Sequence, residues 1–339
     1  MLIKVKSIVL ATLVAASATS LVPSKGVSAE WKPDRRVEIV LGTGAGEGGL
    51  NRTARFLREW LVSKGKIPEN SIVLNKPGGG HALGLAYTAS HEGSAEYIQL
   101  VNTPLITNNI LGRSPITYEQ FTPLALLYDE EVTFTVAKDS KIKDAQDLLA
   151  KLKADPGSIV FSTATGLGTV QHIATLAVAK SAGVDLRSGK LKTVNFSSGN
   201  AEAITAALGG RIDVVVSSPL PVRPFVESGD MRVIAVASEE RAKGFLKDVP
   251  TWKELGVDSR ITAWRAFVAP KGLKPEQVKF WNDTIAELSN SPEWAKELAD
   301  TGGNVRYLDS AHTGEFFKSE TERYSKIYEG LGLEAQAGK

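Results

Sequence analysis

Short apolar runs rich in β-branched residues recur along the chain and are bounded by Gly, Pro, Asn or Ser, a pattern that predicts β-strands. Between them lie segments with apolar residues at helical spacing, such as one from Asn51 that aligns Leu57 with Leu61 and one that begins near Thr169. The predicted strands are residues 37–41, 71–74, 97–101, 132–136, 158–161, 191–194, 212–216 and 233–236. Strands alternating with helices predict an α/β fold in which helices cover both faces of parallel sheet.

The pattern changes near the end of the chain, where one helical segment follows another. Lys274-Pro275 and Ser291-Pro292 each begin a predicted helix, because Pro is favoured in the first helical turn. A last long helix is predicted from Ser310. From Lys274 onward we therefore expect helices alone.

The first residues have the pattern of a secretory signal peptide. Lys4 and Lys6 precede an apolar run over residues 8–16, and small residues follow at Val27-Ser28-Ala29. The apolar run is too short for a permanent membrane span, although an uncleaved anchor remains the alternative. We expect residues 1–29 to be removed and the mature chain to be periplasmic and soluble.

Size and charge limit the class of protein. About 310 residues remain after residue 29, slightly more than one hydrophobic core usually serves, so two lobes are expected. The 40 basic and 38 acidic residues nearly balance, which argues against nucleic acid as a partner. The chain has no cysteine, which excludes disulfides, thiol catalysis and Cys-based zinc sites.

Four strand-to-helix junctions combine glycine with small polar residues. In an open parallel sheet such loops gather at the carboxyl ends of the strands, where ligands bind. Glycine lets the backbone approach a ligand, and the free N–H groups of the following helix favour an anion. The alternative, in which the glycines only make tight turns, stays open. The loops are residues 42–51, 75–81, 162–169 and 196–200.

The first loop also fits the dinucleotide fingerprint, because residues 44–49 read G-x-G-x-x-G between a strand and a helix. That interpretation requires an acidic residue at the end of the second strand, where the chain has Asn75-Lys76-Pro77. A secreted NAD-dependent oxidoreductase is therefore only the alternative function. Because no catalytic motif is present, we expect neither enzyme activity nor a cofactor.

Histidine and arginine provide the remaining candidate chemistry. The four histidines have no ligand-like spacing, so no metal site is expected. His172 follows the third loop and can donate to an anion or simply pack. Trp264-Arg265 can supply an apolar wall and a bidentate carboxylate partner, or Arg265 can form a structural ion pair. Residues 128–131, Tyr-Asp-Glu-Glu, are interpreted as a solvated turn between two strands.

Several stretches together give the chain a family resemblance that covers nearly all of the mature sequence. Their order and spacing resemble the periplasmic receptors of tripartite tricarboxylate transporters, often called Bug receptors. The stretches are residues 37–61, 75–80, 120–125, 166–172, 207–213, 229–236, 248–251 and 267–272.

The resemblance implies a two-lobed periplasmic-binding-protein fold of type II, a Venus flytrap that closes on a small organic carboxylate. It places lobe 1 at residues 30–137 and 264–339, and lobe 2 at residues 138–263. It also implies that the receptor delivers its ligand to integral-membrane permease subunits, although a sensor that serves a signalling partner is the alternative. We expect a monomer.

The resemblance also implies which residues contact the ligand. Relatives that bind amino acids carry Asp after the strand at residues 212–216, where this chain has Ser217-Ser218, which favours a plain mono-, di- or tricarboxylate. The candidate ligand-binding residues are Gly46, Gly48, Gly49, Asn51, Gly168, Thr169, Gln171, His172, Ser198, Gly199, Asn200, Ser217 and Arg265.

Overall fold

The fold is known from a computed structural model that describes residues 30–46, 49–163, 168–196 and 200–329. The predicted signal peptide lies outside these ranges, as does the end of the chain from residue 330. Trp31–Lys339 forms one compact unit, and its described strands form sheets of six, three and two. The architecture is a two-lobed α/β fold.

The larger sheet mixes parallel and antiparallel pairs. Its order is β11-β4-β10-β3-β1-β2, with β1 parallel to both β2 and β3. Strand β10 runs antiparallel to β3 and β4, and β11 runs antiparallel to β4. The bounds are β1 (Glu38–Leu41), β2 (Ile72–Asn75), β3 (Tyr97–Val101), β4 (Phe121–Asp129), β10 (Arg265–Pro270) and β11 (Asn304–Leu308).

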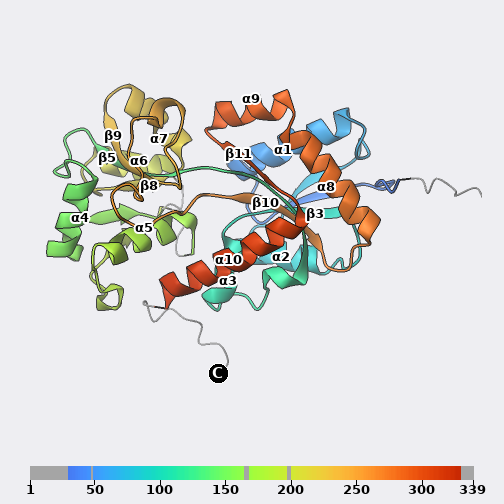
Figure 1. The fold of residues 1–339 in the computed structure, drawn as a ribbon, viewed down its shortest axis with the longest axis horizontal. Helices are drawn as coiled ribbons and strands as arrows, with labels where there is room; N and C mark the ends of the chain where they lie inside the picture. The colour runs from blue at the N-terminus through green and yellow to red at the C-terminus, as the bar shows by residue number, and fades with distance from the viewer. Residues whose placement is uncertain (1–29, 47–48, 164–167, 197–199, 330–339) are drawn as a thin grey trace, which may run out of the picture. The chain divides into compact units, whose positions relative to one another are not determined.

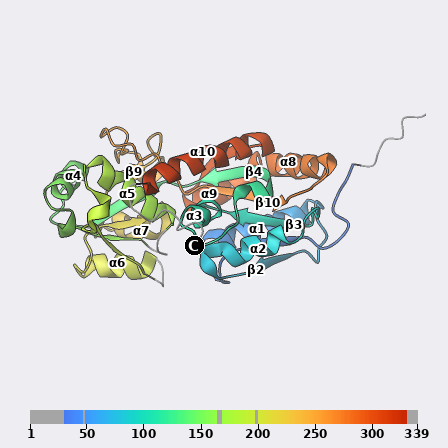
Figure 2. The same cartoon turned by 90° about the horizontal axis from the view of Figure 1, so that it is seen from below.

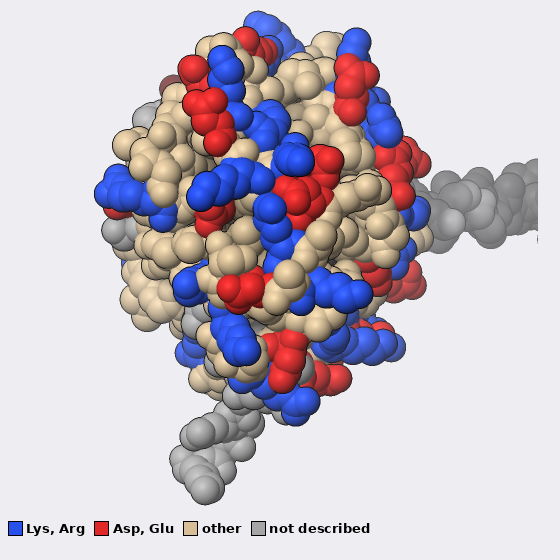
Figure 3. Space-filling model, turned by 90° about the vertical axis from the view of Figure 1, so that its left-hand side faces the viewer, with Lys and Arg blue, Asp and Glu red and all other residues tan. Residues whose placement is uncertain are grey.

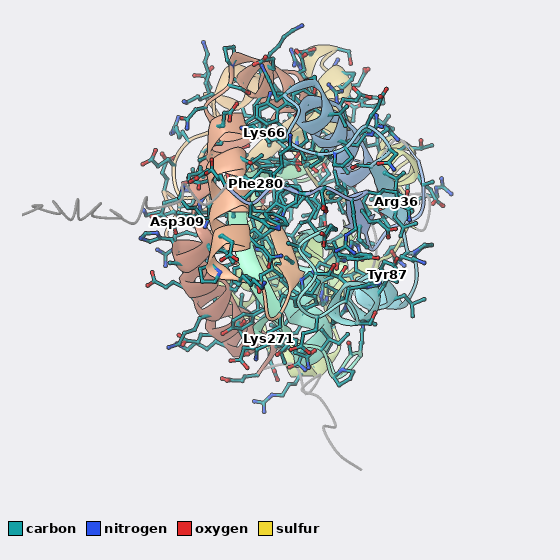
Figure 4. The ribbon with its side chains drawn as sticks, turned by 90° about the vertical axis from the view of Figure 1, so that its right-hand side faces the viewer. Arg36, Lys66, Tyr87, Lys271, Phe280 and Asp309 are labelled. Atoms are coloured by element: carbon teal, nitrogen blue, oxygen red, sulfur yellow. The ribbon has the colours of Figure 1, made fainter. Side chains whose placement is uncertain are left out.

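Helices cover both faces of this sheet. One face buries Leu57, Trp60 and Trp281 from α1 (Gly49–Ser63) and α8 (Pro275–Ser289), with α9 (Pro292–Thr301) beside them. The other face packs against α2 (Ala82–Ala89), α3 (Pro104–Ile110) and α10 (Ser310–Tyr328). In Figure 1, α1 and α9 lie above the sheet and α2, α3 and α10 lie below it. Figure 4 shows the far end of the sheet, with Phe280 marking α8 and Tyr87 marking α2.

The second lobe is built on the two smaller sheets. Strand β5 runs antiparallel between β8 and β9, and β6 pairs in parallel with β7. A parallel bridge between Phe161 and Val214 connects the two sheets. The bounds are β5 (Val132–Ala137), β6 (Val160–Ser162), β7 (Lys192–Val194), β8 (Val215–Ser217), β9 (Met231–Ala237), α4 (Ala145–Ala154), α5 (Val170–Ser181), α6 (Asn200–Leu208) and α7 (Pro219–Glu227).

Helix α10 packs against both lobes. It contacts β4 and α3 on the side of the larger sheet and α5 on the other side, as Figures 1 and 2 show. Five short 3-10 helices complete the described elements: η1 (Gly79–His81), η2 (Tyr118–Gln120), η3 (Pro156–Ser158), η4 (Leu186–Ser188) and η5 (Gly244–Leu246).

Each predicted strand is confirmed to within a few residues, but three strands were missed. Strands β4, β10 and β11 carry the antiparallel pairs of the larger sheet, so the expectation of purely parallel sheet was wrong. The expectation of helices alone after Lys274 was also wrong, because β11 lies between α9 and α10. Its residues are partly buried or, at Val305, exposed, which leaves little of the apolar signal that marks a strand.

Candidate functional site

The first two glycine-containing loops meet at one edge of the larger sheet. Because β1 and β2 are parallel, their carboxyl ends lie side by side. The Asn75 side chain donates to the Thr43 carbonyl (3.0 Å) and to the Asn51 amide oxygen (2.8 Å). The Asn51 side chain in turn donates to the Gly44 carbonyl (2.9 Å). The buried Asn51 side chain therefore holds the first loop in place, while the first turn of α1 carries the N–H groups that lack helical partners.

The second loop is pressed against the first at Gly42. A side chain at Gly42 would place its Cβ 2.6 Å from the His81 Cβ, so only glycine allows this approach. His81 itself has a left-handed backbone (φ 81°), and the preceding Gly80 carbonyl accepts from the Asn108 side chain (2.7 Å). Burial, with a smaller contribution from the Arg265 charge, lowers the pKa of His81 to about 4, so the ring is neutral at pH 7.

Arg265 begins β10 at the same edge of the sheet. Its Nη1 donates to the carbonyls of Ala263 and Trp264, both at 3.0 Å, and its Nη2 lies 3.4 Å from Glu130 Oε2. The guanidinium also lies 5.9 Å from the centre of the Tyr128 ring. Its Nε is buried and has no hydrogen-bond partner among the described residues. Arg265 thus forms the ion pair with Glu130 and still has its Nε–H group available as a hydrogen-bond donor.

Tyr128 joins this cluster to the first loop's helix. Its hydroxyl lies 2.9 Å from Thr53 Oγ1, early in α1. Burial raises the pKa of Tyr128 to about 12, which keeps the phenol protonated. The cluster at this edge therefore consists of Arg265, Glu130, Tyr128 and His81, and we call it the hinge-end cluster.

The segment from Asp129 to Glu131 corrects the prediction of a solvated turn, because all three acidic side chains are buried. Asp129 accepts from Arg306 (2.9 Å), and Glu131 accepts from the Asn304 side chain (2.8 Å). Burial raises the pKa of Glu130 and of Glu131. The Arg265 charge opposes this rise at Glu130, and the hydrogen bond from Asn304 opposes it at Glu131. These residues carry the chain from β4 into β5, and such a crossing cannot be solvated on every side.

Ser217 and Ser218 follow β8 in the second lobe. Ser217 is fully buried, and its hydroxyl donates to the Ser218 carbonyl (2.9 Å). Ser217 also pairs with Thr133, which donates to its carbonyl (3.0 Å). Ser218 lies at the start of α7 and its side chain hydrogen-bonds Glu130, so this loop reaches the hinge-end cluster.

Gly168, near the end of the third loop, contacts the larger lobe. The Gly168 carbonyl accepts from Thr107 Oγ1 of α3 (2.8 Å). His172 Nδ1 accepts from the Gly168 N–H (3.4 Å) and lies 3.3 Å from the Tyr328 hydroxyl of α10. Burial, and to a lesser extent the Arg113 charge, lowers the pKa of His172 to about 4. The contacts of Thr107 with Gly168 and of Tyr328 with His172 thus tie the lobes together, and a ligand role for His172 stays a prediction.

The remaining candidates divide into described and undescribed positions. Thr169 caps α5 by accepting from the His172 N–H (3.4 Å), and Gln171 is half-buried in the first turn of that helix. Gly46 and Gly49 are exposed in the first loop, and Asn200 begins α6 with a buried Oδ1 that lacks a partner among the described residues. Gly48, Ser198 and Gly199 lie outside the described residues.

Among the residues that the structure describes, no group of three or more His, Asp or Glu side chains is placed to hold a metal ion. Within the same ranges, no helix is both long and apolar enough to cross a bilayer. On the face drawn in Figure 3, basic and acidic side chains are interspersed.

A two-lobed α/β fold whose strands lead through loops into helix starts is typical of a solute-binding receptor of the periplasmic type. The sequence profile described as "Tripartite tricarboxylate transporter family receptor" matches residues 56–333. The chain belongs to this family, whose members are periplasmic receptors and not enzymes. The alternative of an NAD-dependent oxidoreductase is therefore set aside.

Named relatives agree with this assignment. The protein BugT of Bordetella pertussis is 26% identical over 312 residues, which cover 90% of this chain and 92% of BugT. A TctC solute-binding protein from Polaromonas, solved without ligand, shares 28% identity at a TM-score of 0.73, covering 88% of this chain and 99% of that one. MatC from Rhodopseudomonas palustris, solved with bound malate, has the same fold at 20% identity and a TM-score of 0.71, covering 87% of this chain and 99% of MatC.

Proposed function

We propose that this chain captures a small organic carboxylate between its two lobes and delivers it to a membrane permease. The observation that carries the proposal is the meeting of the first two loops with Arg265 at one sheet edge. There, the N–H groups at the start of α1 and the positive end of its dipole favour an anion. MatC with malate, and another R. palustris protein of similar fold with adipate, show that this architecture accommodates carboxylates.

The lobe boundary that we propose lies at the acidic crossing. Residues 132–137 form β5, which pairs with β8 and β9 of the smaller sheet. We therefore move the outward crossing from residue 137 to Glu130-Glu131, and keep the return near Ala263. The two crossings are joined there by backbone hydrogen bonds between Glu130 and Ala263 (3.2 and 2.8 Å).

The setting of the receptor follows from its family and its first residues. Residues 1–29 are proposed as a cleaved signal peptide that exports this chain to the periplasm. The partner is proposed to be an integral-membrane permease rather than a signalling protein, because the family is named for a transporter. The receptor is proposed to act as a monomer.

A thermal-shift screen of residues 30–339 against a carboxylate panel tests the function. A cognate ligand at 100 times its dissociation constant should add about 2.7 kcal/mol to the free energy of unfolding. The panel should include malate and adipate at fixed pH and ionic strength. If no carboxylate raises the melting temperature, the proposed function is wrong.

A pair of substitutions at Gly49 tests capture by the first helix. Gly49 is the first residue of α1, and a Cβ there would meet no atom within 4 Å. Gly49→Pro removes the N–H at a position where helices tolerate proline, whereas Gly49→Ala keeps it. We expect the affinity for the screened ligand to fall about 10- to 150-fold in the Pro variant and to change little in the Ala variant, since a lost hydrogen bond to a charged group costs about 1.5–3 kcal/mol. Equal affinities would exclude this amide as a ligand donor.

A further inference from the structure

Glu130 and Arg265 project to the same side of the two crossings. Glu130 and Ala263 are paired through both backbone hydrogen bonds, so their side chains lie on one side, and Arg265, two residues on, lies there too. Asp129 and Glu131 alternate with Glu130 and line a cavity of about 560 Å³ on the other side, next to Arg306. Glu130 therefore belongs to the hinge-end cluster, and its two neighbours do not.

The charges of the hinge-end cluster cancel. Arg265 carries one positive charge, and the Glu130 carboxylate lies 3.4 Å from its Nη2. His81 and Tyr128 are neutral, and the acidic neighbours of Glu130 add no positive charge. A second carboxylate of a ligand would meet the Glu130 charge without a net positive field to offset it, in surroundings where buried charge is costly.

The cluster instead offers both a hydrogen-bond donor and a hydrogen-bond acceptor. The buried Nε–H of Arg265 has no acceptor among the described residues. Glu130 offers carboxylate oxygens, which Arg265 and Ser218 use only in part. A ligand group that both accepts and donates a hydrogen bond, such as a carboxamide or a hydroxyl, matches one donor and one acceptor at once.

We infer that the hinge-end cluster selects a ligand with a single carboxylate and an uncharged carboxamide or hydroxyl at its far end, through the paired side chains of Glu130 and Arg265. The inference rests on the proposed function, because it assumes that the carboxylate is held at the start of α1. It names a ligand class that differs from the dicarboxylates seen with the solved relatives.

Matched probes test this selection on the mature protein. Succinate, glutarate and adipate are each compared with their monoamides, succinamate, glutaramate and adipamate, which have nearly the same shape and one charge fewer. By calorimetric titration at pH 7, the monoamide of the best-fitting length should bind at least about tenfold more tightly than its dicarboxylate, a difference of about 1.4 kcal/mol. A dicarboxylate that binds equally well or better overturns the inference and leaves the proposed function standing. If none of the six binds and the ligand that the carboxylate panel yields has a second carboxylate, or has neither a carboxamide nor a hydroxyl at its far end, the selection is also overturned.

Two substitutions at adjacent positions distinguish a specific effect of the hinge-end cluster from a general effect of removing one negative charge. Glu130→Gln removes the negative charge beside Arg265 and should shift the ratio of affinities at least about tenfold toward the dicarboxylate. Glu131→Gln removes the same charge one residue away on the other side, and should leave the ratio within about twofold, because that side chain faces Asn304. Equal shifts in both variants would overturn the role of Glu130. If Glu130→Gln does not fold, the ranking of the wild-type probes decides alone.

Discussion

Gly42→Ala is expected to destabilise the protein through one close contact between the first two loops. The added Cβ would lie 2.6, 2.8 and 2.9 Å from Cβ, Cα and Cγ of His81. These atoms belong to the backbone or the base of the side chain, so a rotamer change cannot relieve the overlap. Overpacking of this kind costs about 1–3 kcal/mol.

The surrounding structure prevents His81 from moving away from the Cβ added at residue 42. Its backbone is left-handed at φ 81°, and Asn108 holds the carbonyl of Gly80 just before it. Gly84 of α2 approaches the same point, because its own Cβ would lie 2.8 Å from Gly42 Cα. His81 and Gly84 thus both fix the start of α2 against Gly42. We therefore expect Gly42→Ala to lower the free energy of unfolding by an amount near the upper end of the range, about 3 kcal/mol.

Urea unfolding followed by tryptophan fluorescence measures the effect, with Gly44→Ala as the matched control. A Cβ at Gly44 would meet no atom within 4 Å, and its backbone is not left-handed, so the control should change stability by less than about 0.5 kcal/mol. Because the loops that meet at Gly42 form the proposed binding edge, ligand affinity should fall in the first variant only. Equal stability of the two variants would refute the close contact between the loops.

Three further predictions concern contacts that connect the loops and the lobes. A double-mutant cycle of Asn51→Ala and Asn75→Ala should give a coupling energy of about 0.5–1.5 kcal/mol in urea unfolding, from their 2.8 Å hydrogen bond, and additive effects would contradict it. Thr107→Val should cost about 1–3 kcal/mol by leaving the Gly168 carbonyl unpaired, whereas an unchanged unfolding midpoint would show that the bond contributes nothing. The pKa of His172 is lowered to about 4 in the folded state, so the unfolded state binds more protons below pH 6.5 and stability falls as the pH falls from there towards 4. Removing this residue with His172→Gln should make that decline shallower by about 1.4 kcal/mol per pH unit, and parallel curves for variant and wild type would refute the shift.

The sequence predicts the meeting of the first two loops well because this feature follows from local rules. Glycine-rich loops after parallel strands converge at the carboxyl ends of the strands, and Asn75 and Thr43 confirm this by a 3.0 Å hydrogen bond. The loop sequences do not show that Asn51 braces its own loop, because that depends on the register of β1 against β2. The sequence alone therefore does not distinguish a polar loop residue that contacts a ligand from one that hydrogen-bonds the backbone of its own loop.

The hinge-end cluster could not be predicted in the same way, because its members come from distant segments. Glu130 and Arg265 are 135 positions apart and meet only through antiparallel pairing that the alternating pattern did not indicate. One signal was present in the sequence. Only Glu130 and Glu131 separate β4 from β5, and the apolar runs on both sides are buried, which is unusual for a solvated turn.

The tie between the crossings has a consequence for how the receptor recognises its ligand. Glu130 and Arg265 stand on different crossings, but the two backbone hydrogen bonds between Glu130 and Ala263 hold those crossings together at this point. Arg265 is further held by its donation to the Ala263 and Trp264 carbonyls. When the lobes rotate about the crossings, the groups that face Glu130 and Arg265 therefore change more than the geometry between these two side chains. A pair that is formed before the ligand arrives needs little reorganisation on binding, so its selectivity should reside in the charge and hydrogen bonding of the ligand's far end.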